Sequence, residues 1–269
     1  MKDAQVQSVV AAGVAEPALL ARWLHEPELL REYDIDPASL DLHTLWKFTG
    51  LITKVRNSCL RADFPLTFRL LSVTGIEIEL FAHYSLYQSS IPAWSASSTP
   101  MKAQHLLNFI EKSLEPTQWP HALLWDVIRH ENALMRLRGL TIREGRPCAD
   151  SWTAASVPRM SGDLFLYVMR SDPREVAAQL QKSSPALEDI RLGSFHFGYW
   201  RASLGNRVRV LEMDELGFYL LSLVDGEHCA MELCRKLTGN DEYIAAILGA
   251  LGELGSLGIL SYDSISRDR

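Results

Sequence analysis

Residues 207–226 read RVRVLEMDELGFYLLSLVDG and combine the pattern of a half-exposed strand with that of a short helix. From Arg207 to Glu212 charged and apolar residues alternate, which is typical of a strand with one buried face. Asp214 is suited to cap a helix over 215–224, and Asp225-Gly226 ends that helix because glycine readily adopts the left-handed conformation. This stretch therefore predicts a strand followed at once by a helix.

The segments on either side extend this unit to a small sheet covered by three helices. Strands are expected over 163–170 and 195–202, and a tight turn over 203–206 leads into the strand 207–212. Further helices are expected over 229–237 and 241–254, and 255–263 returns as a last strand or wing. Three short helices on a small antiparallel sheet bury one shared core. We therefore expect a winged-helix domain over 163–269.

The first 140 residues are expected to be entirely helical. Asp41 can cap a helix that runs to about residue 60, and in it Leu45, Phe48, Leu51, Ile52 and Val55 have the spacing of a buried stripe. Helical spacing also runs through 4–13, 17–25, 66–73, 76–87, 100–114 and 119–138.

Residues 141–162 contain two glycines and two prolines without a sustained period, which indicates a linker. The predicted class is α+β, with a helical domain over 1–140, a linker over 141–162 and the winged-helix domain over 163–269.

Composition sets limits on location and partners. The net charge is −6, whereas nucleic-acid binding usually requires a basic face, so no nucleic-acid partner is expected. The four cysteines form no CxxC pair and are interpreted as free thiols in a reducing cytoplasm. No stretch has eighteen uninterrupted apolar residues and the start does not resemble a signal peptide. We expect a cytoplasmic protein that does not bind a membrane.

Sequence motifs for catalysis are absent from the chain. It has no GxGxxG opening a helix, no GxxxxGK[ST], no HExxH and no GxSxG. No two of the eight histidines lie three or four residues apart. His121, His130 and Glu131 could still assemble a metal site in three dimensions, but the nine-residue spacing does not place the two histidines well on one helical face. We therefore expect no catalytic residue, no metal and no cofactor in this chain.

The helix expected over 119–138 carries a distinctive pattern. Pro120, Asp126, Arg129, Glu131, Ala133 and Leu134 match a helix found in partner proteins of the multinuclear non-haem iron oxidases, the DUF692-like enzymes. Methanobactin-pathway partner subunits and DUF2063-like proteins share that helix. His130 stands where an apolar residue is usual. The alternative is a solvated helical face with one ion pair.

The C-terminal segment resembles a second family. Its sequence is similar to the peptide-binding winged helix of the PQQ-biosynthesis chaperone, the precursor-recognition element of ribosomal peptide modification systems. Asp225-Gly226 is the most specific part of the match, whereas the remaining positions are core positions that many winged helices would share. The matching residues are Val210, Leu211, Leu220, Leu221, Leu223, Asp225, Gly226, Leu233, Leu237, Leu248, Leu251, Leu254, Gly258, Ile259 and Leu260.

Together the two resemblances imply a non-catalytic partner subunit that forms a heterodimer with an iron-dependent oxidase, most like that of the 3-thiaglutamate pathway. The chain would bind the leader of a precursor peptide and present its C-terminal cysteine, while the iron belongs to the partner enzyme. The leader would add as a strand beside 207–212, with the third helix as the other wall of the groove. The expected peptide-binding residues are Arg207, Val208, Arg209, Val210, Leu211, Glu212, Tyr243, Ile247, Ala250, Leu251 and Leu254. The expected partner-binding residues are Asp126, Arg129, His130 and Glu131.

Several alternatives remain at this point. Arg207 and Arg209 could pair with leader carboxylates or could prevent edge-to-edge aggregation. Gly249 and Gly252 could admit another chain or could allow tight packing within the domain. A winged-helix DNA-binding regulator is the main rival function, although residues 241–254 contain three acids and no Lys or Arg. A stand-alone enzyme is the second rival.

Overall fold

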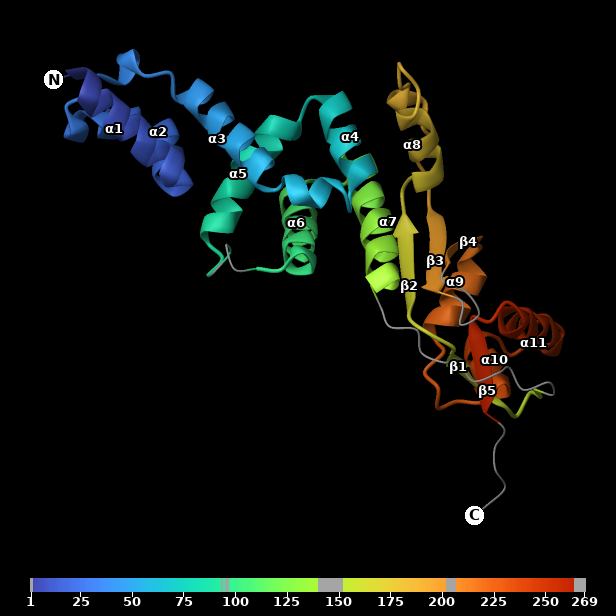
Figure 1. Ribbon diagram of the computed structural model, residues 1–269. Helices are drawn as coiled ribbons and strands as arrows, with labels where there is room; N and C mark the ends of the chain where they lie inside the picture. Colours follow the sequence, from blue (N-terminus) through green and yellow to red (C-terminus); the bar gives the residue numbers. More distant parts are fainter. Residues whose placement is uncertain (1, 93, 95–96, 140–151, 202–206, 264–269) are drawn as a thin grey trace. The chain divides into compact units, whose positions relative to one another are not determined.

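The computed structural model describes residues 2–92, 94, 97–139, 152–201 and 207–263. The fold is α+β, with many helices and two small antiparallel sheets (Figure 1). The chain forms two compact units, one of residues 1–132 and 177–188 and the other of residues 133–176 and 189–269. The boundaries fall within α7 (His121–Gly139), α8 (Pro173–Leu180) and η5 (Leu187–Asp189), so they differ from the predicted division at residue 140.

The N-terminal unit consists of helices, as predicted. Its helices are α1 (Lys2–Ala15), α2 (Pro17–His25), η1 (Pro27–Tyr33), η2 (Pro37–Ser39), α3 (Leu42–Arg56), η3 (Ser58–Arg61), α4 (Pro65–Thr74), α5 (Glu77–Ser89), α6 (Thr99–Ser113) and the first part of α7 (His121–Gly139). Asp41 caps α3, because its carboxylate accepts from the Thr44 amide at 2.9 Å and from the Thr44 hydroxyl at 2.7 Å. Gly75 ends α4 with a φ of 74°, which glycine adopts without strain.

Helix α3 buries a different face from the one predicted. Leu45 is buried, but Phe48, Leu51 and Val55 are exposed and Ile52 is only half-buried. The reason is Gly50, which brings α3 close to α5. A Cβ at Gly50 would lie 2.2 Å from the carbonyl oxygen of Ile78, so only glycine permits this approach. The buried face is therefore centred on Trp46, Thr49, Gly50 and Thr53.

The C-terminal unit is built on a three-stranded antiparallel sheet in the order β2–β3–β4. Its strands are β2 (Leu164–Met169), β3 (Phe195–Arg201) and β4 (Val208–Met213), and the predicted turn over 203–206 lies outside the described residues. The register places Leu166 opposite Gly198 and Gly198 opposite Leu211. Because side chains alternate across a sheet, these three residues share one face.

Both faces of this sheet are covered within the unit. Trp200 and Leu211 contact a core formed by α9 (Glu215–Ser222), α10 (Ala230–Leu237) and α11 (Asp241–Ser256). On the opposite face, Phe197 and Tyr199 pack against the end of α7 through Ala133 and Leu137. The predicted helices after β4 are confirmed, and Gly226 has the predicted positive φ of 76°.

A second, two-stranded sheet corrects the predicted linker. Strand β5 (Leu260–Asp263) was expected, but its antiparallel partner is β1 (Val157–Met160), which lies inside the predicted linker 141–162. Trp152 also packs down, stacking on Tyr262 at 5.0 Å between ring centroids. Residues 140–151 lie outside the described residues, whereas 152–162 belong to the C-terminal unit. The pattern missed this strand because its partner lies about a hundred positions away in sequence.

Candidate peptide-binding site

Strand β4 forms one edge of the three-stranded sheet. Every residue of β4 is paired with β3, and β2 occupies the opposite edge. An edge strand presents unpaired backbone N–H and C=O groups on its outer side, and these can pair with an added strand. Val208, Val210 and Leu211 are half-buried, whereas Arg207, Arg209 and Glu212 are exposed. The strand predicted to receive a peptide is therefore at a sheet edge.

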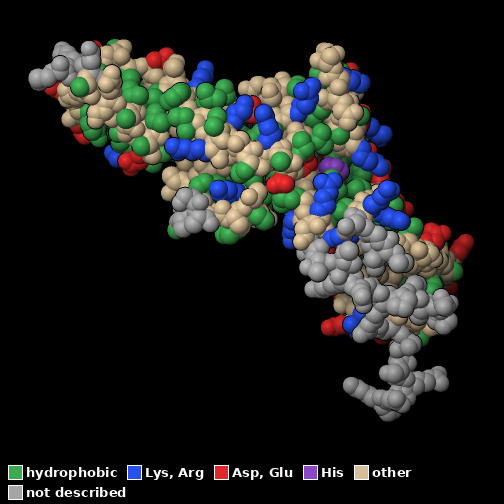
Figure 2. All heavy atoms as spheres, viewed as in Figure 1, with side chains coloured by type: hydrophobic (Ala, Val, Ile, Leu, Met, Phe, Trp, Pro, Cys, Tyr) green, Lys and Arg blue, Asp and Glu red, His purple; other side chains and the backbone are tan. Residues whose placement is uncertain are grey.

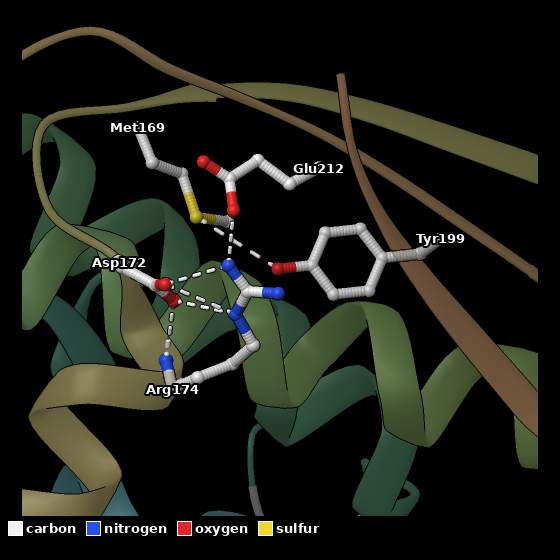
Figure 3. Close-up of polar contacts among 5 residues, drawn as sticks. All are labelled: Met169, Asp172, Arg174, Tyr199 and Glu212. Atoms are coloured by element: carbon white, nitrogen blue, oxygen red, sulfur yellow. Dashed lines mark hydrogen bonds and ion pairs between the residues drawn. The ribbon is translucent and has the colours of Figure 1, made fainter.

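The charged side chains of β4 differ in their surroundings. Glu212 forms an ion pair with Arg174, whose guanidinium also binds Asp172 at 2.7 Å (Figure 3). The Arg174 guanidinium lies over the Phe197 ring, 5.1 Å from its centroid. Glu212 is thus held by the start of α8 (Pro173–Leu180) and is less available to a ligand than was predicted.

Asp172 is the anchor of this network. Burial by itself raises the pKa of Asp172, but hydrogen bonds from the Arg174 guanidinium and amide outweigh that effect and lower it. The hydrogen bond to Asp172 is also the largest cause that raises the pKa of Arg174. Both Asp172 and Arg174 therefore remain charged at neutral pH.

Arg207 and Arg209 have no ion-pair partner in the part of the chain that the structure describes. Both are exposed, at the start of β4 and immediately before it. In a chain of net charge −6, two unpaired arginines at a sheet edge favour an acidic partner. They equally oppose pairing of this edge with a second copy of itself.

An open groove of about 780 Å³ lies beside α9, on the face of the sheet that α9, α10 and α11 cover. The ring centroids of His196 and Phe218, two of its lining residues, are 5.0 Å apart. Val168, Leu216 and Tyr219 are exposed large apolar side chains, an unusual concentration for a surface that contacts only water. The groove is lined by Val168, His196, Asp214, Glu215, Leu216, Phe218 and Tyr219.

These groove residues were missed from the sequence, although one signal was present. Helix α9 reads ELGFYLLS and carries apolar residues all round, so one set faces the core and another does not. Leu220 and Leu221 are buried, whereas Leu216 and Tyr219 are exposed. A helix of this kind indicates a second contact surface.

The predicted second wall, helix α11, is corrected by the structure. Ile247 and Leu251 are buried in the core with Trp200, so they cannot contact a peptide without unfolding the unit. Leu254 is half-buried against the same core. Only Tyr243 and Ala250 of the predicted wall are exposed. Helix α11 packs mainly on α10 and β5.

The two α11 glycines have different surroundings. A Cβ at Gly252 would lie 2.8 Å from the Trp152 ring, so this glycine permits tight packing within the unit. A Cβ at Gly249 would meet no atom within 4 Å among the described residues.

The residues on α7 that were expected to bind a partner do not form an exposed surface. Asp126, His130 and Glu131 are buried. The Glu131 carboxylate accepts from the amides of Leu66 and Thr67 at 2.7 and 2.8 Å, which caps the start of α4. Residues of the pattern that resembles the iron-oxidase partner proteins therefore make contacts inside this unit. Their burial was not predicted because a sequence does not distinguish a buried, hydrogen-bonded polar side chain from an exposed one.

Arg129 is the remaining member of that face and is half-buried. Its Nε donates to Glu111 Oε1 at 2.8 Å, and its guanidinium lies 4.4 Å from the centroid of the Trp125 ring. A partner that used Arg129 would have to displace an existing ion pair. This residue therefore belongs to the internal polar contacts of the N-terminal unit.

Among the described residues, no group of three or more His, Cys, Asp and Glu side chains is placed to hold a metal ion. Nor, over the same residues, is any single helix long and apolar enough to cross a membrane; α1 and α2 meet that test only as a pair bent by 110°.

No family model matches the sequence, and no curated protein is significantly similar to it.

Proposed function

We propose that the C-terminal unit is a winged-helix module that binds an extended peptide by strand addition at β4. The observation that carries this proposal is the outer edge of β4, which is paired on one side only within the described chain. Strand addition gives affinity through backbone hydrogen bonds and specificity through side-chain pockets. The apolar groove at α9 is lined by Val168 of β2 and His196 of β3 and by no residue of β4, so it is a contact surface separate from the β4 edge.

The bound segment is proposed to be the leader of a ribosomally made precursor peptide. Support comes from the resemblance of residues 207–260 to precursor-recognition winged helices and from the unpaired Arg207 and Arg209, which suit an acidic leader. The chain then presents the C-terminal cysteine of the peptide to an iron-dependent oxidase of the DUF692-like class. Its own contribution is binding and orientation, which turn a loose encounter into a productive one. The iron and oxygen chemistry belongs to the partner.

A DNA-binding regulator is the rival function of a winged helix, and the charges disfavour it. The third helix of the module, α11, carries Asp241, Glu242 and Glu253 on exposed positions and has no Lys or Arg. Phosphate contacts require cations there. A peptide ligand does not impose this requirement.

The proposal requires that a short cysteine-ending peptide be encoded beside the gene for this chain. The test labels that peptide with a fluorophore and follows its binding by anisotropy. Replacing Arg207 and Arg209 together with Glu should weaken binding about tenfold or more, because two attractive contacts become repulsive. Replacing Arg235 and Lys236 on α10 together with Glu is the matched control, since it also reverses two exposed cations. Equal effects of both changes would contradict the proposal, as would the absence of any such gene.

Proline substitutions test the strand geometry. Neighbouring residues of a strand point their N–H groups to opposite edges, so Val208→Pro and Arg209→Pro remove donors from different sides. The variant that keeps its circular dichroism spectrum has lost an outward donor and should bind the peptide about tenfold more weakly. Unchanged affinity in that variant would exclude strand addition at this edge. Copurification with the neighbouring oxidase tests the partner separately.

A further inference from the structure

Helix α3 carries an exposed apolar stripe in the N-terminal unit. Phe48 is 49% exposed, Leu51 42% and Val55 63%. These residues are three and four positions apart, so they lie in a row along one face of the helix. Figure 2 shows hydrophobic side chains gathered over α3 on the surface. The opposite face already packs against α5, so the stripe is not required for the core of this unit.

The segment that carries this stripe is basic in sequence. Residues 42–62 contain Lys47, Lys54, Arg56 and Arg61 and no Asp or Glu, in a chain of net charge −6. Lys54 and Arg61 both contact Glu77, at 2.6 and 3.7 Å.

Lys47 and Arg56 remain uncompensated. Both are exposed and have no ion-pair partner among the described residues. By helical spacing they lie on the two sides of the stripe. The surface is therefore apolar along its centre and positive along both sides.

A pocket of about 360 Å³ adjoins the stripe, and Ile52 and Arg56 of α3 line it. Thr49 and Thr53 also line it, and their hydroxyls donate to backbone carbonyls of the same helix, at 3.1 and 2.9 Å. Their oxygens therefore keep acceptor capacity. The other lining residues are Val14, Ala15, Pro17, Ser85, Gln88, Ser89, Ile91 and Trp94.

We propose that this α3 face binds an acidic amphipathic helix of a partner protein. Its apolar residues, spaced at i, i+3 and i+7, would cover Phe48, Leu51 and Val55, and its flanking carboxylates would pair with Lys47 and Arg56. The pocket would take one larger side chain of that helix. An anionic membrane also attracts a basic, apolar helix face. It would not use this pocket, whose lining combines apolar side chains with hydroxyl and amide groups, so the structure favours a protein partner.

This inference goes beyond the proposed peptide binding and does not rest on it, because all of these residues belong to the N-terminal unit. The full chain is titrated with a labelled synthetic peptide of about sixteen residues, long enough for a helix to be induced, with Leu at the i, i+3 and i+7 positions and Glu elsewhere. A second peptide has Lys in place of every Glu. A third sample consists of phosphatidylcholine vesicles with about a quarter phosphatidylserine.

The acidic peptide should bind at least about tenfold more tightly than its lysine counterpart, and raising NaCl from about 0.05 M to about 0.5 M should weaken that binding. Val55→Asp and Arg56→Glu should each weaken it about tenfold. Met101→Asp is the control, because Met101 is 54% exposed but lies on α6.

Three results would overturn the proposal. These are binding to the vesicles without binding to the acidic peptide, equal binding of both peptides, and full affinity in both α3 variants. Since the variants change exposed residues, their thermal unfolding should match that of the wild type, and a folding defect would show there. Arg207 and Arg209 variants should bind this acidic peptide normally, which separates this test from that of the β4 edge.

Discussion

The Glu131 carboxylate accepts hydrogen bonds from both the backbone amide and the hydroxyl of Thr67, at 2.8 and 2.7 Å. A third bond, from the Leu66 amide at 2.7 Å, completes the cap on α4. The Leu66 and Thr67 amides have no partner within α4, since the first amides of a helix have none. Glu131 therefore joins α7 to α4 inside the N-terminal unit.

Glu131→Ala should reduce the free energy of unfolding by about 3 kcal/mol, because buried donors lose their acceptor and a small cavity forms. Urea denaturation followed by circular dichroism measures this. Glu79→Ala is the control, since the Glu79 side chain is 70% exposed, and it should change stability by less than about 0.5 kcal/mol. If the two variants were equally stable, Glu131 would not be the cap described.

The pH dependence of this site follows from its burial. Burial raises the pKa of Glu131 above its ordinary 4.5, outweighing the hydrogen bonds from Leu66 and Thr67. The unfolded chain releases this proton first as pH rises. The associated stability is therefore complete below pH 4.5 and is lost as the pH rises through the folded-state pKa. The Glu131→Gln variant does not titrate here.

Unfolding of wild type and Glu131→Gln should be compared from about pH 4 to about pH 8. The stability of the wild type relative to the variant should fall as pH rises. A relative stability that increases over the same range would mean that the carboxylate is stabilised in its charged form and that the direction of the shift is opposite.

Leu251 and Tyr243 lie on the same helix, α11, but one is a buried core residue and the other is exposed. Leu251 is fully buried, whereas Tyr243 is 61% exposed. Leu251→Ala should cost about 2–5 kcal/mol of unfolding free energy through the lost contacts and the cavity. Tyr243→Ala should cost less than about 0.5 kcal/mol. A destabilising Tyr243→Ala would show that its ring packs on the unit after all.

Local patterns in the sequence predict local structure well. The alternation over 207–212 and the Asp225-Gly226 stop correspond to β4 and to the turn after α9. Asp41 caps α3 as predicted. Each of these depends on residues within a few positions of one another. That is why periodicity and capping rules suffice for them.

The incorrect predictions involve contacts between distant segments. The stripe on α3 faces outward because Gly50 draws the other face to α5, which helical spacing alone does not reveal. Asp126 and Glu131 are buried, although a sequence pattern places such residues at the surface. The groove at α9 combines Val168, His196 and Leu216 from three elements, so no single segment predicts it.

Gly249 and Gly252 offer a matched pair on one helix. Alanine at Gly252 would place a Cβ 2.8 Å from the Trp152 ring, and Trp152 in turn stacks on Tyr262. Gly252→Ala should therefore lower the free energy of unfolding by about 1–3 kcal/mol, even though alanine favours a helix. Gly249→Ala meets no such contact and should raise it by about 1 kcal/mol through helix propensity. Differential scanning calorimetry should show the two melting temperatures moving in opposite directions, and a rise in both would mean that Trp152 does not pack on α11.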